Sequence, residues 1–217
     1  MKKDLTQGKP LDHLLTLTLP TIWGALAVMS MNLADTWIIA RLGPDALAAV
    51  SFTFPVVMII TSIAFGIGTA SISLITRAVG SKQTETAAAY ATHTLAIALS
   101  IGLFFALLGL ATITPLFRLL QAPEHLLPLI HDYMSLWYLG SIFIILTLVS
   151  NAIIRASGNT RFPSLVLIGV SVLNLGLTPL LVHGLFGFPK LALHGAALAT
   201  SCAFLVGLIV ATHHLRA

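Results

Sequence analysis

Six apolar runs constrain the fold of this chain more than any other feature. Each is close to the roughly 20 residues that an α-helix needs to cross the hydrocarbon core of a bilayer. None alternates apolar and polar residues, as the strands of a membrane β-barrel would. The sequence therefore predicts an all-α membrane protein, a bundle of six transmembrane helices. We expect the spans at residues 20–40, 51–76, 86–112, 134–154, 163–182 and 196–212.

The composition supports a membrane protein and argues against a nucleic-acid partner. Of the 217 residues, 57% are hydrophobic and only 8% are charged, whereas soluble domains are about a quarter charged. The net charge is +4, but the basic residues are scattered singly between the apolar runs. The lipid bilayer is therefore the expected partner. The single cysteine, Cys202, lies in an apolar run and cannot form a disulfide within the chain.

The basic residues predict the orientation in the membrane. Six spans place both termini on one side, and cytoplasmic segments carry an excess of Lys and Arg. With both termini in the cytoplasm, eight basic residues are inside and three are outside; the inner ones are Lys2, Lys3, Lys9, Arg77, Lys82, Arg155, Arg161 and Arg216, and the outer ones Arg41, Arg118 and Lys190. We therefore expect a multi-pass protein of the inner (cytoplasmic) membrane. Residues 1–15 are expected to form a cytoplasmic or interfacial segment.

One carboxylate lies where lipid-facing residues are expected. Among the seven acidic residues, Asp35 alone falls within a membrane-length apolar run, PTIWGALAVMSMNLADTWIIA. A charge near mid-membrane costs roughly 3 kcal/mol, so such a group faces a bundle interior or a wet cavity. Asp35 either binds a proton or a coupling ion, or forms hydrogen bonds with Asn32 or Thr36 and only holds two helices together.

Five local stretches, in order, carry a family resemblance. They are DTWIIARLGPDALAAVS from residue 35, FGIGTAS with the downstream RAVGS, NAIIRASGNTRFP, LNLGLTPLLV and LHGAALATS. Together the chain resembles the N-terminal lobe of multidrug and toxic compound extrusion (MATE) transporters. The resemblance implies a secondary-active antiporter, not an enzyme, that couples entry of a proton or Na⁺ to efflux of drug-like organic cations. It implies no cofactor beyond that ion.

The resemblance also implies a missing partner. Family members have twelve spans in two lobes, so this chain corresponds to one lobe. It is either a fragment whose C-terminal six-helix lobe is missing, or a half-length protein that pairs with a second copy. An inactive or flippase-like half-transporter is an alternative.

The family's N-lobe cation site implies candidate residues in this chain. The first-helix carboxylate is Asp35 and the helix-five amide is Asn174. One turn later the family commonly has a second acid, whereas this chain has Thr178, on the same helix face as Asn174. Fewer carboxylates hold Na⁺ less well, so we favour proton coupling, with Na⁺ at Asp35 as the alternative. Asn151 and Thr200 are candidate wall or relay residues, or only a helix cap and a packing hydroxyl.

Two further expectations concern other chemistry. An intramembrane serine protease would use Ser157 with His194, but these fall toward opposite faces of the membrane, and a span of about 20 residues separates such positions by roughly 30 Å. Large apolar side chains are candidates for a drug-binding surface, namely Trp23, Met29, Met31, Phe52, Phe54, Met58 and Trp137. The eight histidines show no spacing that predicts a metal site.

Overall fold

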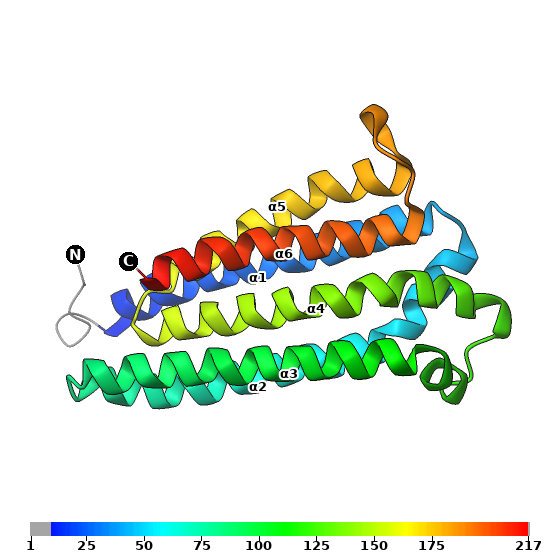
Figure 1. Ribbon diagram of the computed structural model, residues 1–217. Coiled ribbons are helices and arrows are strands. Elements are labelled where there is room, and N and C mark those ends of the chain that lie inside the picture. Colours follow the sequence, from blue (N-terminus) through cyan, green and yellow to red (C-terminus); the bar gives the residue numbers. More distant parts are fainter. Residues whose placement is uncertain (1–9, 217) are drawn as a thin grey trace.

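The computed structural model describes residues 10–216, with the side chains of residues 18–216, and this part of the chain is all-α, as the sequence predicts (Figure 1). The long helices are α1 (Pro10–Ala40), α2 (Pro44–Gly80), α3 (Thr84–Leu119), α4 (Leu127–Ala156), α5 (Arg161–His183) and α6 (Ala192–Arg216). Two 3-10 turns, η1 (Glu124–Leu126) and η2 (Leu185–Gly187), precede α4 and follow α5. Residues 1–9 of the expected N-terminal segment lie outside the described residues.

All six helices are long and apolar enough to cross a membrane. Every expected span falls within one of them, but the helices extend further. The 37 residues of α2 measure about 55 Å at 1.5 Å per residue, well beyond the roughly 30 Å of a hydrocarbon core. The difference arises because hydropathy marks only the apolar part, whereas polar residues at both ends continue the helix.

Turn residues end the helices where the backbone requires them. Gly43 has φ of 123° before α2, and Pro44 occupies the first turn of that helix, where its missing N–H costs nothing. Gly184 adopts the left-handed conformation after α5, with φ of 70°, the common way for a helix to end. The short turn before α2 and the longer connection between α5 and α6 each bring the next helix back antiparallel (Figure 1).

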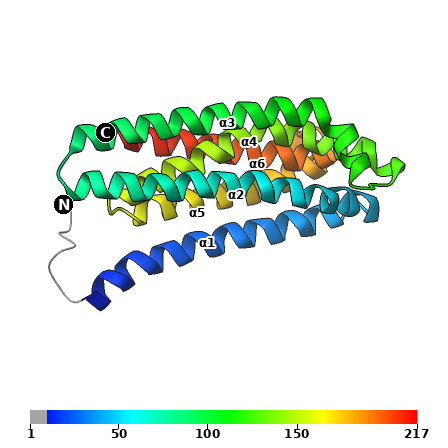
Figure 2. The ribbon, with the colours of Figure 1, turned by 90° about the horizontal axis from the view of Figure 1, so that it is seen from below.

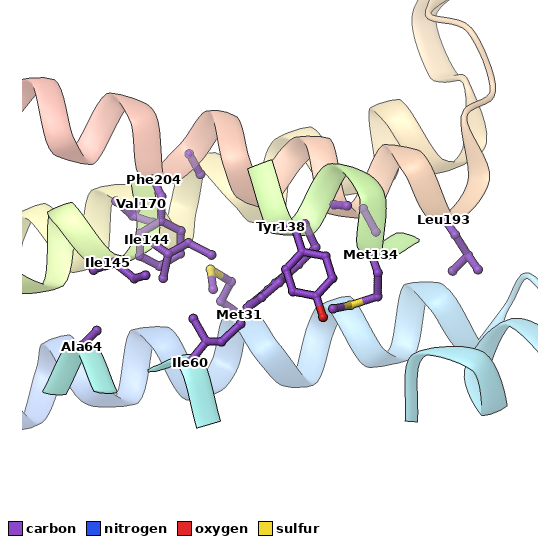
Figure 3. Packing of buried hydrophobic residues seen from close by; sticks show 14 of the residues in the cluster. Met31, Ile60, Ala64, Met134, Tyr138, Ile144, Ile145, Val170, Leu193 and Phe204 are labelled. Carbon is purple, nitrogen blue, oxygen red and sulfur yellow. The ribbon is translucent and has the colours of Figure 1, made fainter. Parts of the chain in front are cut away.

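The α4 helix forms the centre of the bundle. It packs against α2, α3 and α6, while α5 packs between α1 and α6 (Figures 1 and 2). The core around α4 includes Met134, Tyr138 and Ile145, which are all at most 1% exposed (Figure 3). Small residues allow this close packing: a side chain at Gly109 would collide with the Tyr138 ring, which lies against it. Such small-residue contacts are typical of helices packed in membranes.

The α1 helix has one well-packed side. It packs mainly against α5 and only lightly against α2. At Gly24 a Cβ would lie 3.2 Å from Ser164 Cα of α5, so the two backbones approach closely. The opposite side of α1 is exposed in the single chain, as the 61% exposed Trp23 shows.

The expected apolar drug-binding surface is divided between exposed and buried positions. Trp23, Met29, Phe54 and Met58 are exposed, Phe52 is partly buried, and Met31 and Trp137 are buried. Met31 and Trp137 therefore fill the core and do not face a cavity.

The two ends of the bundle differ in what they contain. The start of α1, the end of α6 and the turns 81–83 and 157–160 share one end, which we call the terminal end. The turn 41–43, residues 120–126 and the connection 184–191 share the opposite end.

Candidate functional site

Four of the predicted site residues meet where α1, α5 and α6 come together. The hydroxyl of Thr178 donates a hydrogen bond to Asp35 Oδ1 at 2.9 Å. The side-chain amide of Asn174 lies between Asp35 and Thr200, with one amide atom 3.0 Å from Asp35 Oδ1 and the other 3.0 Å from Thr200 Oγ1. We call Asp35, Asn174, Thr178 and Thr200 the polar cluster. It connects three helices that are far apart in the sequence.

The orientation of the Asn174 amide depends on the charge of Asp35. With its nitrogen toward an ionised Asp35, the amide donates at 3.0 Å to Oδ1, while its oxygen accepts from Thr200. In the opposite orientation the nitrogen donates to Thr200 Oγ1 at 3.0 Å and the oxygen faces the carboxyl group. Because an ionised carboxylate only accepts hydrogen bonds, the first orientation fits the charged form of Asp35.

The polar cluster is shielded from solvent. Asn174 and Thr178 are 0% exposed, and Asp35 and Thr200 are partly buried. Among the described side chains, Asp35 has no ion-pair partner, because the two ion pairs there join Arg118 to Glu124 and His194 to Asp132. Neutral donors of the described residues therefore hold the carboxylate.

Local sequence explains why α5 presents these groups together. Asn174 and Thr178 are four residues apart and therefore share a helix face. Pro179, inside the same helix, has no N–H to donate to the carbonyl of Leu175, which frees an oxygen on the preceding turn. This segment of α5 therefore offers the side-chain oxygens of Asn174 and Thr178 and the backbone carbonyl oxygen of Leu175.

Hydrogen bonds of Asp35 with Asn32 or Thr36, the alternative that the sequence left open, are not among those described. Thr36 donates its hydroxyl to the backbone carbonyl of Asn32 at 2.8 Å, and Asn32 is exposed. The described hydrogen bonds of Asp35 instead reach across to α5.

Asn151 does not join the polar cluster. It lies in α4, is 0% exposed, and neither its amide nitrogen nor its amide oxygen has a hydrogen-bond partner among the described residues. A residue that the sequence did not single out, Tyr133 of α4, lies within electrostatic range of Asp35. Its sequence context is that of any tyrosine near a membrane interface, so only the packing of α4 reveals it.

The geometry excludes a catalytic pair of Ser157 and His194. Ser157 follows α4 at the terminal end and donates its hydroxyl to the Ile154 carbonyl at 2.8 Å. His194 lies in the first turn of α6 at the opposite end, with Nε2 3.9 Å from Asp132 Oδ1. The full length of the bundle separates the two residues.

A comparison with protein families identifies the kind of protein. The family model described as MatE matches residues 20–180, which is most of the chain. The chain belongs to the MATE transporter family. It is accordingly a multi-pass membrane protein from a family of transporters, and its six helices correspond to half of the solved MATE structures.

Individual relatives and structures agree with this assignment. The MATE chain is 42% identical over 195 residues to an FAD transporter of Shewanella oneidensis, covering 90% of this chain and 43% of that protein. It is 33% identical over 175 residues to the probable multidrug resistance protein YoeA of Bacillus subtilis, covering 81% of this chain and 38% of that protein. It superposes on the Vibrio cholerae MATE transporter VcmN in the bent form with a TM-score of 0.89 and 34% identity, covering 94% of this chain and 46% of VcmN. The MATE chain thus spans less than half the length of these relatives.

Proposed function

We propose that this chain forms one lobe of a secondary-active exporter in which Asp35 couples entry of a proton or Na⁺ to efflux of the substrate. The observation that carries the proposal is the polar cluster. It holds one carboxylate, shielded from solvent and without an ion-pair partner among the described side chains, on hydrogen bonds from two side chains of α5. Such a group in a membrane span is expected to be functional.

The polar cluster suits a proton because its hydrogen bonds can reverse. With Asp35 ionised, Thr200 donates to the Asn174 oxygen and the Asn174 nitrogen donates to Asp35. With Asp35 protonated, its O–H donates to the turned Asn174 oxygen, the amide nitrogen donates to Thr200, and Thr200 donates to the Ala196 carbonyl at 3.1 Å. The two arrangements use the same four side chains, and the change between them requires only that the Asn174 amide turns and that hydroxyl and carboxyl protons move.

Na⁺ is the alternative coupling ion. Its ligands would be the carboxylate of Asp35 with neutral oxygens of Asn174 and Thr178. Hard cations require several oxygens, and their affinity rises with the number of charged ligands. Because the polar cluster has one carboxylate, we propose proton coupling as the main mode.

We propose that α1 transmits the change. Protonation removes the charged acceptor that joins α1 to α5 and so weakens the contact between the two helices. Pro20 interrupts the hydrogen-bond ladder of α1, and Gly24 lets α1 pack closely on Ser164. A bend near these residues would reshape the lobe, and a related Vibrio cholerae transporter is described in a bent form. Coupling requires that ion and substrate bind different states with different affinities.

The terminal end is proposed to face the cytoplasm of the inner membrane. Basic residues favour the cytoplasmic side, and five of the described ones are at this end, against three at the other: Arg77, Lys82, Arg155, Arg161 and Arg216 against Arg41, Arg118 and Lys190. Substrate would therefore enter from the terminal end.

A second six-helix lobe is proposed to complete the transporter. The relatives are about twice as long as this chain, and α1 and α2 expose large apolar side chains in the single lobe. A C-terminal lobe or a second copy of this chain would cover part of this surface. If the chain is instead an inactive or flippase-like half-transporter, neither pairing with a C-terminal lobe nor pairing with a second copy should produce export.

Two substrate classes remain candidates. Drug-like organic cations are the class that the MATE resemblance implies, and several relatives are named probable multidrug resistance proteins. FAD is favoured by the 42% identity to a protein named as an FAD transporter.

Replacing Asp35 tests the coupling. In cells that express the native protein, Asp35→Asn should abolish efflux of FAD and of an organic-cation dye, with the protein still present in the membrane. Asp45→Asn is a matched control, because Asp45 is exposed in the first turn of α2. Retained efflux in the Asp35 variant would overturn the coupling role. Collapsing the proton gradient or the Na⁺ gradient separately identifies the ion.

A further inference from the structure

Arg155, at the end of α4, differs from the other basic residues whose side chains are described. Those seven are all exposed: Arg41, Arg77, Lys82, Arg118, Arg161, Lys190 and Arg216. Of the eight basic residues with described side chains, only Arg155 is partly buried. Its Nε is fully shielded from solvent. The attraction of basic residues to the cytoplasmic side explains exposed side chains that reach water. It does not explain an arginine whose Nε is shielded from solvent.

The guanidinium of Arg155 has no counter-charge within the described residues. The ion pairs of this part of the chain involve Arg118 and His194 at the opposite end, and Arg155 Nε has no hydrogen-bond partner. Shielding an unpaired charge from water is costly unless an anion compensates it. The position therefore calls for a negatively charged partner from outside the described chain.

Asn151 adds a second unpartnered group to the same helix face. It precedes Arg155 by four residues, one helical turn deeper in the bundle. It is 0% exposed, and its amide nitrogen and oxygen both lack partners among the described residues. Buried polar groups are nearly always hydrogen-bonded to protein or to bound molecules, so Asn151 is a second group near the end of α4 that requires a partner.

Arg155 also borders a small cavity between α2 and α4. The cavity measures about 40 Å³, and its other walls are mainly apolar residues such as Ala64, Gly68 and Ala152. This space holds water or a few ligand atoms, not a whole nucleotide. A ligand would place only its charged group beside Arg155 and extend out past the terminal end.

We infer that Arg155 and Asn151 bind a phosphate group at the terminal end of α4. The planar guanidinium donates two parallel hydrogen bonds to phosphate oxygens, and the Asn151 amide can donate another. The phosphate belongs either to a nucleotide substrate such as FAD or to a lipid headgroup of the adjacent leaflet. The substrate reading rests on the proposed function, in which substrate enters from this end. An unpaired guanidinium would repel an organic cation, so this site favours FAD over drug-like cations.

The test is a binding measurement in inside-out vesicles from cells that express the native protein. The probes are FAD, riboflavin, which has the same ring system without phosphate, and inorganic pyrophosphate as a competitor. Arg155→Gln should weaken FAD binding about tenfold or more, the scale of a lost charge-assisted hydrogen bond. It should leave riboflavin binding unchanged. Arg161→Gln, which removes the same charge from an exposed residue of the same region, should bind FAD like the wild type.

Two further variants keep the test decisive if Arg155→Gln is absent from the membrane. Arg155→Lys keeps the charge but loses the two-pronged geometry, so it should retain part of the FAD affinity. Asn151→Asp adds a negative charge beside Arg155 and should weaken FAD and pyrophosphate binding together. Equal FAD binding by the wild type, Arg155→Lys and Asn151→Asp, together with lipid labelling that does not depend on Arg155, overturns the inference.

A photoreactive lipid distinguishes a lipid phosphate from a substrate phosphate at this site. In vesicles of phosphatidylcholine with a photoreactive phosphatidylglycerol, labelling that depends on Arg155 and resists FAD assigns the phosphate to lipid. Labelling that FAD displaces assigns the site to substrate. The outcome is distinguishable from that of the coupling test, because continued export by Asp35→Asn would refute the proposed coupling while leaving the phosphate site intact.

Discussion

Thr178 donates its hydroxyl to Asp35 Oδ1 at 2.9 Å, although 143 residues separate the two along the chain. The contact joins the first membrane helix to the fifth and makes the carboxylate part of the α1–α5 interface. Any change in the charge of Asp35 is therefore also a change in the packing of these helices.

Removing the Thr178 hydroxyl should impair export more than stability. Thr178→Val keeps the shape but cannot donate to Asp35, and hydrogen bonds between membrane helices contribute about 0.6 kcal/mol on average. We expect efflux to fall several-fold with near-normal protein in the membrane, measured by dye or FAD efflux and immunoblotting. Thr178→Ser restores the donor and should recover efflux. Full activity of the valine variant would show that the contact is only structural.

Adding a carboxylate should change the ion preference. Thr178→Asp places a second acid one turn from Asn174, next to Asp35. Two carboxylates hold Na⁺ more tightly than one, so efflux should become dependent on external Na⁺, measured with and without a Na⁺ gradient at constant pH. Thr178→Asn, which adds an oxygen without charge, is the control. A variant that ignores Na⁺ would argue against a site that cations can occupy.

A side chain at Gly24 should disrupt the contact of α1 with α5. A Cβ there lies 3.2 Å from Ser164 Cα, so Gly24→Val forces the helices apart at a cost of about 1–3 kcal/mol. The thermal midpoint of a fluorescent fusion in membranes should fall. Gly66→Ala is the control, because no atom lies within 4 Å of its added Cβ, and a helical alanine is about 1 kcal/mol better than glycine. Equal midpoints for the valine variant and the wild type would contradict the close α1–α5 packing.

The proposed orientation predicts which loops a membrane-impermeant reagent reaches. In a Cys202→Ser background, Phe186→Cys at the opposite end should react with an impermeant maleimide in intact spheroplasts, since Phe186 is 92% exposed. Ser81→Cys, in the α2–α3 turn of the terminal end, should react only after permeabilisation. The reverse pattern would place the terminal end outside.

Much of the fold and most of the polar cluster could be predicted from the sequence because apolar length and one misplaced carboxylate are local signals. Asp35 stands out within its run, and Asn174 and Thr178 share a face by spacing alone. Side-chain direction was less predictable. In a helix that is apolar on all sides, periodicity does not tell a core residue from a lipid-facing one, so Met31 and Trp23 look alike although one is buried and the other exposed.

Contacts between helices that are far apart in the chain also could not be predicted from the sequence. The interaction of Tyr133 with Asp35 joins α4 to α1, two helices that pack mainly against other neighbours, and the shielding of Arg155 Nε depends on how α4 packs in the bundle. Both residues have unremarkable neighbours in the chain. Only the assembled bundle distinguishes Arg155 from Arg161, six residues later.

The unequal packing of α1 and α4 has an evolutionary consequence. Because α4 is enclosed by three neighbours, most substitutions on it should be lost through instability before they alter transport. The lightly packed side of α1 and the exposed side of α2 carry no such penalty. Lineages that acquire new substrates should therefore accumulate their differences on α1 and α2, while α4 diverges slowly.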